Sequence, residues 1–139
     1  MRLVVDTNVV VSALLWGGVP RQLLDAIHQG RATAFTSSAL VKELREVLAR
    51  EKFAALIARF GKNPEALAES YIGIAQLIES ATLPDPGALR DPKDAPVLAC
   101  AIAARVDAIV SGDLDLGVLA SFGNIPILTP AECLRRIGS

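Results

Sequence analysis

The sequence has few of the side chains that most hydrolases use as nucleophiles and general bases. It contains a single histidine, His28, and two cysteines, Cys100 and Cys133, whose positions do not match the spacing of a zinc site. We expect both cysteines to be reduced and packed within helices, and His28 to lie near a helix end. The glycine patterns of the P-loop and of the dinucleotide-binding turn are also missing. These absences argue against Ser-His-Asp and Cys-His catalysis and against nucleotide hydrolysis by a P-loop.

Long apolar runs and an excess of positive charge are missing as well. The longest apolar stretches are far shorter than the roughly 20 residues that cross a bilayer, and a strand pattern begins at once without a leader peptide. We therefore expect a cytoplasmic protein that does not enter the membrane. The formal net charge of −1 gives no general attraction to nucleic acid, so any phosphate must be bound locally. Arg21, Arg90 and Lys93 lie in or beside predicted loop-to-helix junctions that suit this role.

Aliphatic residues dominate what is present. Hydrophobic residues make up 52% of the 139 positions and aromatic residues 4%, which favours a core of alanine, valine, leucine and isoleucine. The length suits one domain over residues 1–139. Short apolar segments alternate with helical patterns, which predicts an α/β fold: a three-layer α/β/α sandwich around a mostly parallel sheet of four to five strands. The predicted strands cover residues 2–6, 32–36, 81–83, 108–111 and 125–128.

Capping residues, prolines and glycines predict where the helices begin and end. Ser37 or Ser38 can cap one helix, and Thr129 can cap another that begins at Pro130. Between residues 64 and 79 apolar side chains recur at near-helical spacing, which predicts one long amphipathic helix. A stretch rich in proline, glycine and aspartate before the Asp94 helix is expected to form a loop. The predicted helices cover residues 8–15, 20–29, 38–50, 52–60, 64–79, 94–105, 114–120 and 130 onward.

Two aspartates follow predicted strands directly. Asp6 ends the segment Leu3-Val4-Val5-Asp6, and Asp113 follows the strand that ends at Ser111. An open parallel sheet binds ligands beyond the C-terminal ends of its strands, so both carboxylates are expected at this crevice. Asp94 and Glu43 lie on segments that can converge on the same edge. Carboxylates in one crevice repel one another unless a cation neutralises them, and oxygen ligands without histidine or cysteine favour Mg²⁺ or Mn²⁺.

Asp6 and Glu43 each have a structural alternative. Asp6 can cap the helix that follows it, although Asn8 can do so instead and leave Asp6 available to the crevice. Glu43 falls on the border of the buried stripe of its helix, so its side chain can reach inward. It can equally form a solvated ion pair with Lys42 or Arg45.

The acids of the second half are also open to two interpretations. Asp94 suits a helix N-terminus, where the helix dipole favours an acid, but Asp91 can supply the cap and leave Asp94 as a ligand. Asp113 and Asp115 lie two residues apart at a turn, so one can be a primary metal ligand and the other an auxiliary one. Gly112 lets the backbone approach a ligand closely, although Gly-Asp is also an ordinary turn dipeptide.

Four acidic segments follow one another in a characteristic order. They are Val5-Asp6-Thr7-Asn8-Val9, residues 37–48 around Glu43, Asp91-Pro92-Lys93-Asp94 with the helix after it, and Val110-Ser111-Gly112-Asp113-Leu114-Asp115-Leu116. In this set the chain resembles the PIN-domain ribonuclease family, and most of all its toxin-type (VapC-like) single-domain members. The resemblance runs from residue 1 to about 130. Pro96 departs from the family pattern, but the first turn of a helix tolerates it because early helix amides lack internal acceptors.

The resemblance implies a metal-dependent endoribonuclease that is the toxin of a toxin–antitoxin pair. One or two Mg²⁺ or Mn²⁺ ions would activate water for in-line attack on an RNA phosphodiester. Family members often form dimers, and in toxin pairs a small antitoxin protein occupies or blocks the acidic crevice. By matching motifs, the expected catalytic and metal-binding residues are Asp6, Glu43, Asp94 and Asp113, with Asp115 as auxiliary metal ligand and Asn8 and Ser111 as supporting neighbours.

Two other functions are compatible with the same acids. A PIN-like module that binds RNA or a protein without cleaving it needs no catalytic geometry, and a phosphatase or phosphoacceptor domain would use Asp6 as the phosphorylated residue. Cleavage of RNA that EDTA and Asp6→Asn abolish would distinguish the nuclease from both. Single-stranded RNA is the expected substrate, because specific RNA readers usually bind unpaired segments.

Overall fold

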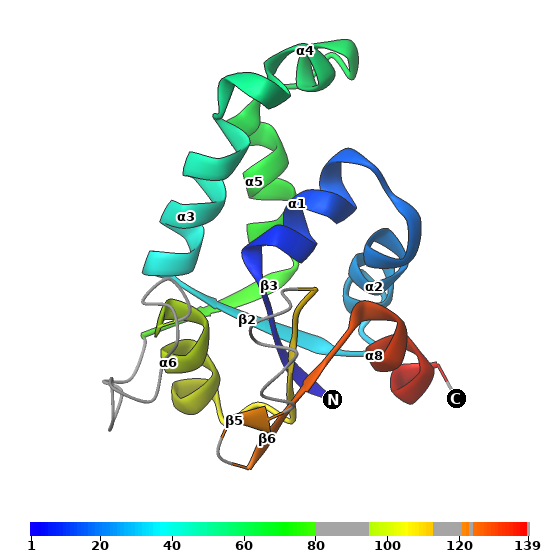
Figure 1. The fold of residues 1–139 in the computed structure, drawn as a ribbon, viewed down its shortest axis with the longest axis vertical. Helices are drawn as coiled ribbons and strands as arrows, with labels where there is room; N and C mark the ends of the chain where they lie inside the picture. The colour runs from blue at the N-terminus through cyan, green and yellow to red at the C-terminus, as the bar shows by residue number, and fades with distance from the viewer. Residues whose placement is uncertain (80–94, 113–120, 123, 139) are drawn as a thin grey trace.

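The structure, a computed structural model, describes residues 1–79, 95–112, 121–122 and 124–138 (Figure 1). Strands and helices alternate through most of the chain. In order the elements are β1 (Arg2–Val5), α1 (Thr7–Leu15), α2 (Gly18–His28), β2 (Thr33–Ser37), α3 (Ser38–Leu48), α4 (Glu51–Arg59), α5 (Pro64–Ile72), β3 (Ala75–Ile78), α6 (Ala95–Ala104), β4 (Ala108–Val110), β5 (Ser121–Phe122), β6 (Ile125–Leu128) and α8 (Pro130–Ile137).

The strands form one sheet in the order β3-β2-β1-β4-β6-β5. Five strands are parallel, and the two-residue strand β5 adds an antiparallel edge to β6. From β1 the chain passes to β2 and β3 on one side, and then returns to the other side of β1 to form β4 and β6. The strand order therefore reverses between β1 and β4, which is where open α/β sheets have their ligand crevice. The predicted α/β class with a mostly parallel sheet is confirmed.

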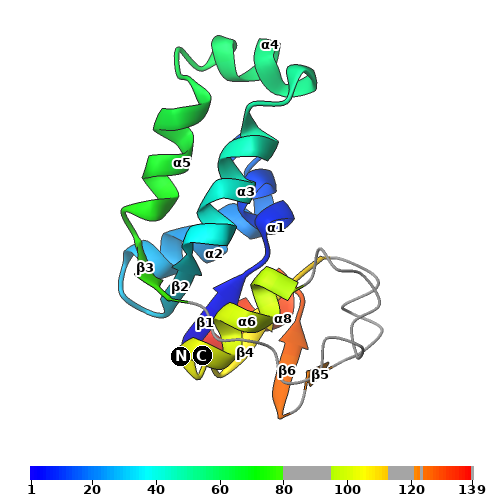
Figure 2. The same cartoon turned by 90° about the vertical axis from the view of Figure 1, so that its left-hand side faces the viewer.

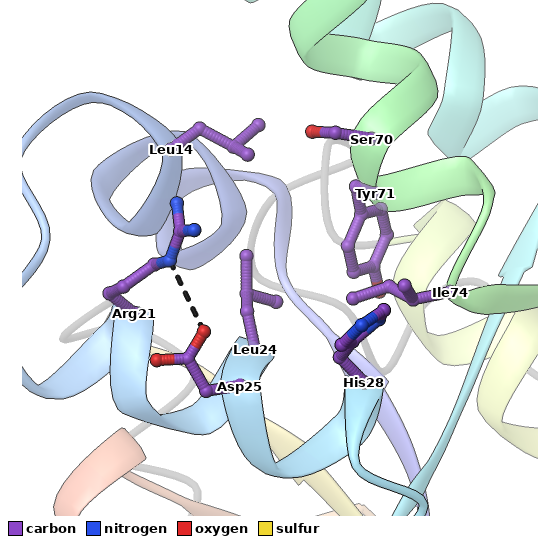
Figure 3. Close-up of a pocket in the computed structure, with 8 residues that line it drawn as sticks. All are labelled: Leu14, Arg21, Leu24, Asp25, His28, Ser70, Tyr71 and Ile74. Atoms are coloured by element: carbon purple, nitrogen blue, oxygen red, sulfur yellow. Dashed lines mark hydrogen bonds and ion pairs between the residues drawn. The ribbon is translucent and has the colours of Figure 1, made fainter.

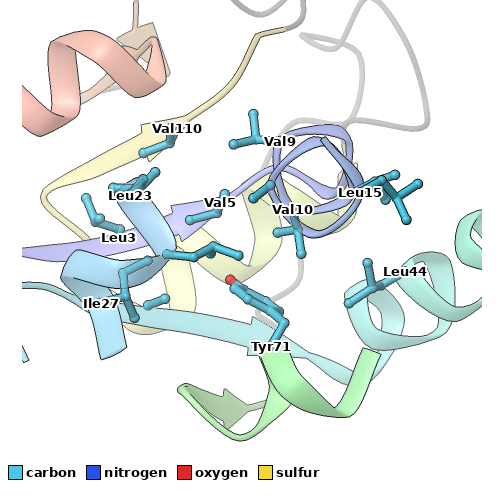
Figure 4. Packing of buried hydrophobic residues seen from close by; sticks show 14 of the residues in the cluster. Leu3, Val5, Val9, Val10, Leu15, Leu23, Ile27, Leu44, Tyr71 and Val110 are labelled. Atoms are coloured by element: carbon cyan, nitrogen blue, oxygen red, sulfur yellow. The ribbon is translucent and has the colours of Figure 1, made fainter. Parts of the chain in front are cut away.

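The core lies on both faces of the sheet, because the strands are apolar on both sides. Along β1, Leu3 and Val5 belong to the cluster that includes side chains of α1, α2, α3, α5 and α8, part of which Figure 4 shows. Val4 between them belongs to the opposite cluster, which is built mainly from α6. Ile109 of β4 also faces α6, while Val110 faces the first cluster. This alternation produces the three predicted layers, with α6 on one face and the other helices opposite (Figure 2).

Two predicted helix caps are present. The Ser37 hydroxyl accepts a hydrogen bond from the Leu40 amide at 3.3 Å, so α3 begins directly where β2 ends. The Thr129 hydroxyl accepts one from the Glu132 amide at 3.2 Å at the start of α8. Side-chain caps of this kind stabilise a helix by about 1 kcal/mol each. They also fix the turn that leads out of each strand.

The prediction of one helix over residues 64–79 is wrong. The helix α5 ends at Ile72, Gly73 is its C-cap, and Ala75–Ile78 forms β3, which pairs in parallel with β2. Glycine disfavours the helix interior by about 1 kcal/mol relative to alanine, and the open edge of β2 offers backbone donors and acceptors to the following residues. Residues 75–78 therefore form a strand of the sheet, although their apolar spacing alone is compatible with a helix. Leu77, which the helical pattern assigns to the buried face, is 60% exposed on this edge strand.

Several predicted elements lie outside the described residues. These are the strand at 81–83, the loop at 84–93 and the helix at 114–120. Among the helices that the structure does describe, none is both long and apolar enough to span a bilayer.

Candidate active site

The backbone of Asp6 joins the sheet to the first helix. Its amide donates to the carbonyl of Val110 at 2.9 Å, which extends the pairing of β1 with β4 by one residue. Its carbonyl accepts hydrogen bonds from the amides of Val9 and Val10 at 3.0 and 3.2 Å, so Asp6 is the N-cap residue of α1. No side-chain hydrogen bond caps this helix. The backbone alone therefore makes the strand-to-helix turn, and the alternative in which the Asp6 carboxylate serves as the cap is wrong.

The carboxylate of Asp6 instead meets a side chain from the neighbouring strand. The Ser111 hydroxyl, one residue past β4, donates to Oδ2 of Asp6 at 3.2 Å. Both side chains are buried, with exposed fractions of 8% for Asp6 and 3% for Ser111. The amide of Ser111 donates to the carbonyl of Leu128 at 2.9 Å, which holds the serine in line with β6. The ends of β1 and β4 thus bring the two residues together at the point where the strand order reverses.

Asn8 does not occupy the N-cap position of α1. It is the second residue of α1 and its side chain is exposed. The N-cap position belongs to Asp6, so Asn8 does not cap the helix. It lies within the first turn, next to the positive end of the helix dipole, where a polar side chain can contact an anion that approaches the crevice.

Glu43 belongs to α3, whose first residue follows the C-terminal end of β2. The stripe of α3 that packs into the core contains Leu40, Val41, Leu44, Val47 and Leu48. Glu43 is half-buried at the border of this stripe, while Glu46 is exposed, as the helical spacing predicts. The helix also packs against α1, the helix that follows Asp6. The helix that carries Glu43 therefore starts at the same edge of the sheet as Asp6.

The remaining predicted ligands lie outside the part of the chain that the structure describes. Asp94 immediately precedes Ala95, the first residue of α6, and Asp113 follows Gly112 in the sequence. Asp115 is two residues further on. Within residues 1–79, 95–112, 121–122 and 124–138, no three histidine, cysteine, aspartate or glutamate side chains are grouped closely enough to hold a metal ion. The complete ligand set therefore stays a prediction.

The two cysteines are structural, as predicted. Cys100 of α6 and Cys133 of α8 are free thiols without any exposed surface. Burial raises the pKa of each thiol from 9.0 to about 11. Both are therefore protonated at neutral pH and unable to act as thiolate nucleophiles. His28 is exposed in the last turn of α2, near the helix end as predicted.

A cavity of about 250 Å³ lies between α1, α2 and α5 (Figure 3). An exposed ion pair joins Arg21 and Asp25 at 3.3 Å on one side of it, and His28 and Tyr71 line the other. The Tyr71 hydroxyl is buried with no hydrogen-bond partner among the described residues, and burial raises its pKa. The sequence offers no signal for this cavity, because its lining comes from separate helices. None of the predicted metal ligands lines it, but Arg21, a predicted phosphate contact, does.

Comparison with known proteins agrees with this arrangement. The structure is similar to a chain in the crystal structure of VapBC2 from Rickettsia felis bound to a DNA fragment from its promoter, with a TM-score of 0.65 and 15% sequence identity over 93% of this chain and 98% of that one. At this identity the likeness establishes the fold. A search of curated protein sequences found no match. The sequence pattern of the PIN domain, however, matches residues 2–115. This span covers most of the chain and contains the strand ends where Asp6 and Ser111 meet, so the chain belongs to the PIN domain family.

Proposed function

We propose that this protein is a metal-dependent endoribonuclease that hydrolyses phosphodiester bonds of single-stranded RNA. The observation that supports this most strongly is the buried Asp6 carboxylate at the reversal point between β1 and β4. A buried carboxylate is costly to desolvate, and the turn into α1 does not use this side chain as its cap. A role in ligand binding accounts for both features. Membership of the PIN domain family agrees with this interpretation.

The proposed ligand set is compatible with Mg²⁺ or Mn²⁺ because every donor is a carboxylate oxygen. Because α6 leads into β4, which runs parallel to β1, the first turn of α6 is directed to the same edge as Asp6, and Asp94 precedes it in sequence. Asp113 follows two residues after Ser111. When bound, the ion would polarise the scissile phosphate and lower the pKa of water. The proposed ligands are Asp6, Glu43, Asp94 and Asp113, with Asp115 as an auxiliary.

The residues of the chain have separate tasks in this proposal. Ser111 orients the Asp6 carboxylate through its hydroxyl, and both side chains are buried. The N-terminus of α1 places the exposed Asn8 at this edge, where the positive end of the helix dipole favours a phosphate group. Glu43 supplies negative charge from the α3 side. The chain therefore contributes ligands from separate elements around one edge of the sheet.

Cleavage assays with isosteric variants test the proposal. Purified protein is expected to cleave single-stranded RNA with Mg²⁺ or Mn²⁺ and to stop when EDTA is added. Asp6→Asn, Asp113→Asn and Glu43→Gln should each lower the rate by about a hundredfold or more, the loss typical when one electrostatic group is removed from a reacting site. Glu46→Gln is the matched control, because it removes the same charge from the exposed face of α3.

Circular dichroism must show that each variant still folds. Full metal-dependent activity in both Asp6→Asn and Asp113→Asn would contradict the assignment of the ligands. Binding of RNA by the wild-type protein without any turnover would favour the alternative of a non-catalytic PIN-like module. Stable, acid-labile phosphorylation of Asp6 would instead favour phosphoaspartate chemistry.

We further propose that the protein is the toxin of a toxin–antitoxin pair, that it forms a homodimer, and that it acts in the cytoplasm. The fold similarity to a chain from the VapBC2 crystal structure supports a protein partner. Expression of the wild-type chain alone should then arrest bacterial growth, whereas Asp6→Asn should not. Light scattering of the purified protein should give twice the 14.6 kDa chain mass. Growth unaffected by an active nuclease would contradict the toxin role, and a monomer mass would contradict the dimer.

A further inference from the structure

The helices α3, α4 and α5 form an arm that projects beyond the C-terminal edge of the sheet, with α4 at its far end (Figures 1 and 2). The arm begins where β2 ends, at the edge that also carries Asp6. The surface of interest lies on α4 and on the residue that follows α1. We call it the α4 tip, and it consists of Trp16, Lys52, Phe53, Arg59 and Phe60.

The α4 tip gathers the exposed aromatic residues. Trp16 is 62% exposed and Phe60 is 48% exposed, whereas Phe35, Phe53 and Tyr71 are buried. The ring of Trp16 meets Phe53 edge-on, with the centroids 5.6 Å apart and an interplanar angle of 70°. Phe53 and Phe60 are seven residues apart, so they lie on the same side of α4 at a spacing of about 10 Å. Solvent can therefore reach the rings of Trp16 and Phe60, whereas Phe53 is 9% exposed and packs behind Trp16.

Cations lie beside these aromatic residues. Lys52 places its ammonium 5.0 Å from the centroid of the Phe53 ring, and Arg59 precedes Phe60 in the same way that Lys52 precedes Phe53. Residues 50–62 carry four cations and one acid, a net charge of +3 in a chain whose total is −1. All five charged side chains are exposed. None of them belongs to a salt bridge in the described part of the chain.

We propose that the α4 tip binds single-stranded RNA on one side of the cleaved bond. The proposal rests on the nuclease function and names the surface that holds its substrate. Exposed aromatic rings stack on bases of any sequence, and lysine and arginine beside them neutralise the phosphates between those bases. The eleven residues of α3 span about 16 Å, so the tip is separated from the edge of the sheet by the length of a short RNA segment.

The positive charge of the α4 tip favours RNA over a protein segment as the molecule that binds there. An overall acidic chain whose active site is made of carboxylates repels a polyanion, so binding RNA requires a basic surface elsewhere. The α4 tip is such a surface, because Lys52 and Arg59 each precede an aromatic residue and both cations are exposed. A protein partner would match the apolar rings alone, but it would need an acidic segment to balance the cations. The bases of RNA can contact the aromatic rings, and its phosphates can balance the cations.

Tryptophan fluorescence tests this directly, because Trp16 is the only tryptophan of the chain. An oligouridylate of about a dozen nucleotides, a length in the range of single-strand binding sites, is titrated into the full-length protein in EDTA so that no cleavage occurs. We expect Trp16 emission to be quenched along a saturable curve that weakens as salt is added. Unchanged emission together with RNA binding detected by anisotropy would overturn the proposal, since the RNA would then bind elsewhere.

Charge-matched variants provide the second measurement, with labelled RNA followed by anisotropy. The double variant Lys52→Gln, Arg59→Gln should lower the slope of log affinity against log salt by about 1.4, because each single-strand phosphate contact contributes about 0.7. The control Arg31→Gln, Arg135→Gln removes two exposed cations outside the tip and should leave the slope unchanged. Trp16→Leu should weaken binding about five- to a hundredfold. Equal slopes for both double variants, or tight binding of an acidic apolar peptide in place of RNA, would overturn the assignment.

Failure of this proposal is distinguishable from failure of the nuclease function. If the tip variants bind and cleave RNA like the wild type, the nuclease stands and the surface is wrong. If the wild type binds RNA through Trp16 but never cleaves it with Mg²⁺ or Mn²⁺, the surface stands and the nuclease is wrong.

Discussion

The hydrogen bond between Ser111 and Asp6 allows a prediction that does not depend on enzymatic activity. Ser111→Ala removes the hydroxyl that donates to the buried Asp6 carboxylate. A hydrogen bond to a charged group contributes about 1.5–3 kcal/mol to stability. The observed 3.2 Å is longer than a strong hydroxyl–carboxylate bond, so we expect the lower end of that range, about 1.5 kcal/mol. For a chain of 139 residues this corresponds to a fall in Tm of about 5 °C.

The charge of Asp6 accounts for part of this loss, which a double-mutant cycle measures. In the Asp6→Asn background the serine hydroxyl faces a neutral amide, and we expect Ser111→Ala to cost only about 0.5 kcal/mol. The coupling energy between the two positions should therefore be about 1 kcal/mol, well above the error of additivity for independent sites. Urea unfolding followed by circular dichroism in EDTA gives all four free energies of unfolding.

The control for this cycle is Ser70→Ala. Its hydroxyl donates to the carbonyl of Leu67 within α5 and makes no contact with Asp6, so its effect should be the same in both backgrounds. If Ser111→Ala costs the same with aspartate and with asparagine at position 6, to within about 0.3 kcal/mol, then the serine does not interact with the charge. The orienting role of Ser111 would then be wrong.

Three further predictions concern the core. Tyr71→Phe should raise the free energy of unfolding by about 1 kcal/mol in urea unfolding, because it removes a buried hydroxyl that has no partner among the described residues; a loss of stability would show that the hydroxyl is satisfied. The free energy of unfolding should be constant below pH 9 and fall between pH 9 and 11, because Cys100 and Cys133 lose their protons in the unfolded chain before the buried thiols do. Each thiol should account for a loss of up to about 2 kcal/mol near pH 11, and the double alanine variant should show a smaller fall. Leu98→Ala, at a position with no exposed surface, should cost about 3 kcal/mol, and a loss below 1 kcal/mol would contradict its role between α6 and the sheet.

Short-range sequence patterns correctly predicted the buried strands, the helix caps and the residues at the strand ends, because local interactions determine these features. A strand such as β1, apolar on both faces and followed by an acid, has few alternatives, because only a parallel sheet buries both faces of so short a segment. Ser37 and Thr129 were identifiable as caps because a hydroxyl just before a helical pattern satisfies an orphan amide. The positions of Asp6 and Ser111 at strand ends also followed from the sequence, but the pairing of their strands and the contact across 105 residues required the topology.

The failed prediction at residues 64–79 has a tertiary cause. Ala75–Ile78 carries a spacing compatible with a helix, and only the neighbouring edge of β2 makes a strand more favourable. A single sequence contains no information about an edge that forms from residues 33–37. The cavity beside Tyr71 is hidden for a similar reason, since it arises from the angles at which α1, α2 and α5 pack. Both features depend on distances between elements rather than on patterns within them.

The backbone of Asp6 shapes the fold, whereas its carboxylate is available for a functional role. Its amide completes the pairing with β4 and its carbonyl begins α1, so the turn from strand to helix uses only groups that every residue possesses. Asparagine could make the same backbone contacts without the cost of burying a charge. A carboxylate that is 8% exposed, at the reversal point of the sheet and against a serine from the next strand, is therefore better explained by what it binds than by what it supports. This reasoning requires that Asp6→Asn folds nearly as stably as the wild type in EDTA, because the weaker hydrogen bond to Ser111 is offset by the lower cost of burying an amide. Aspartate should be clearly more stable than asparagine only when a divalent cation is added.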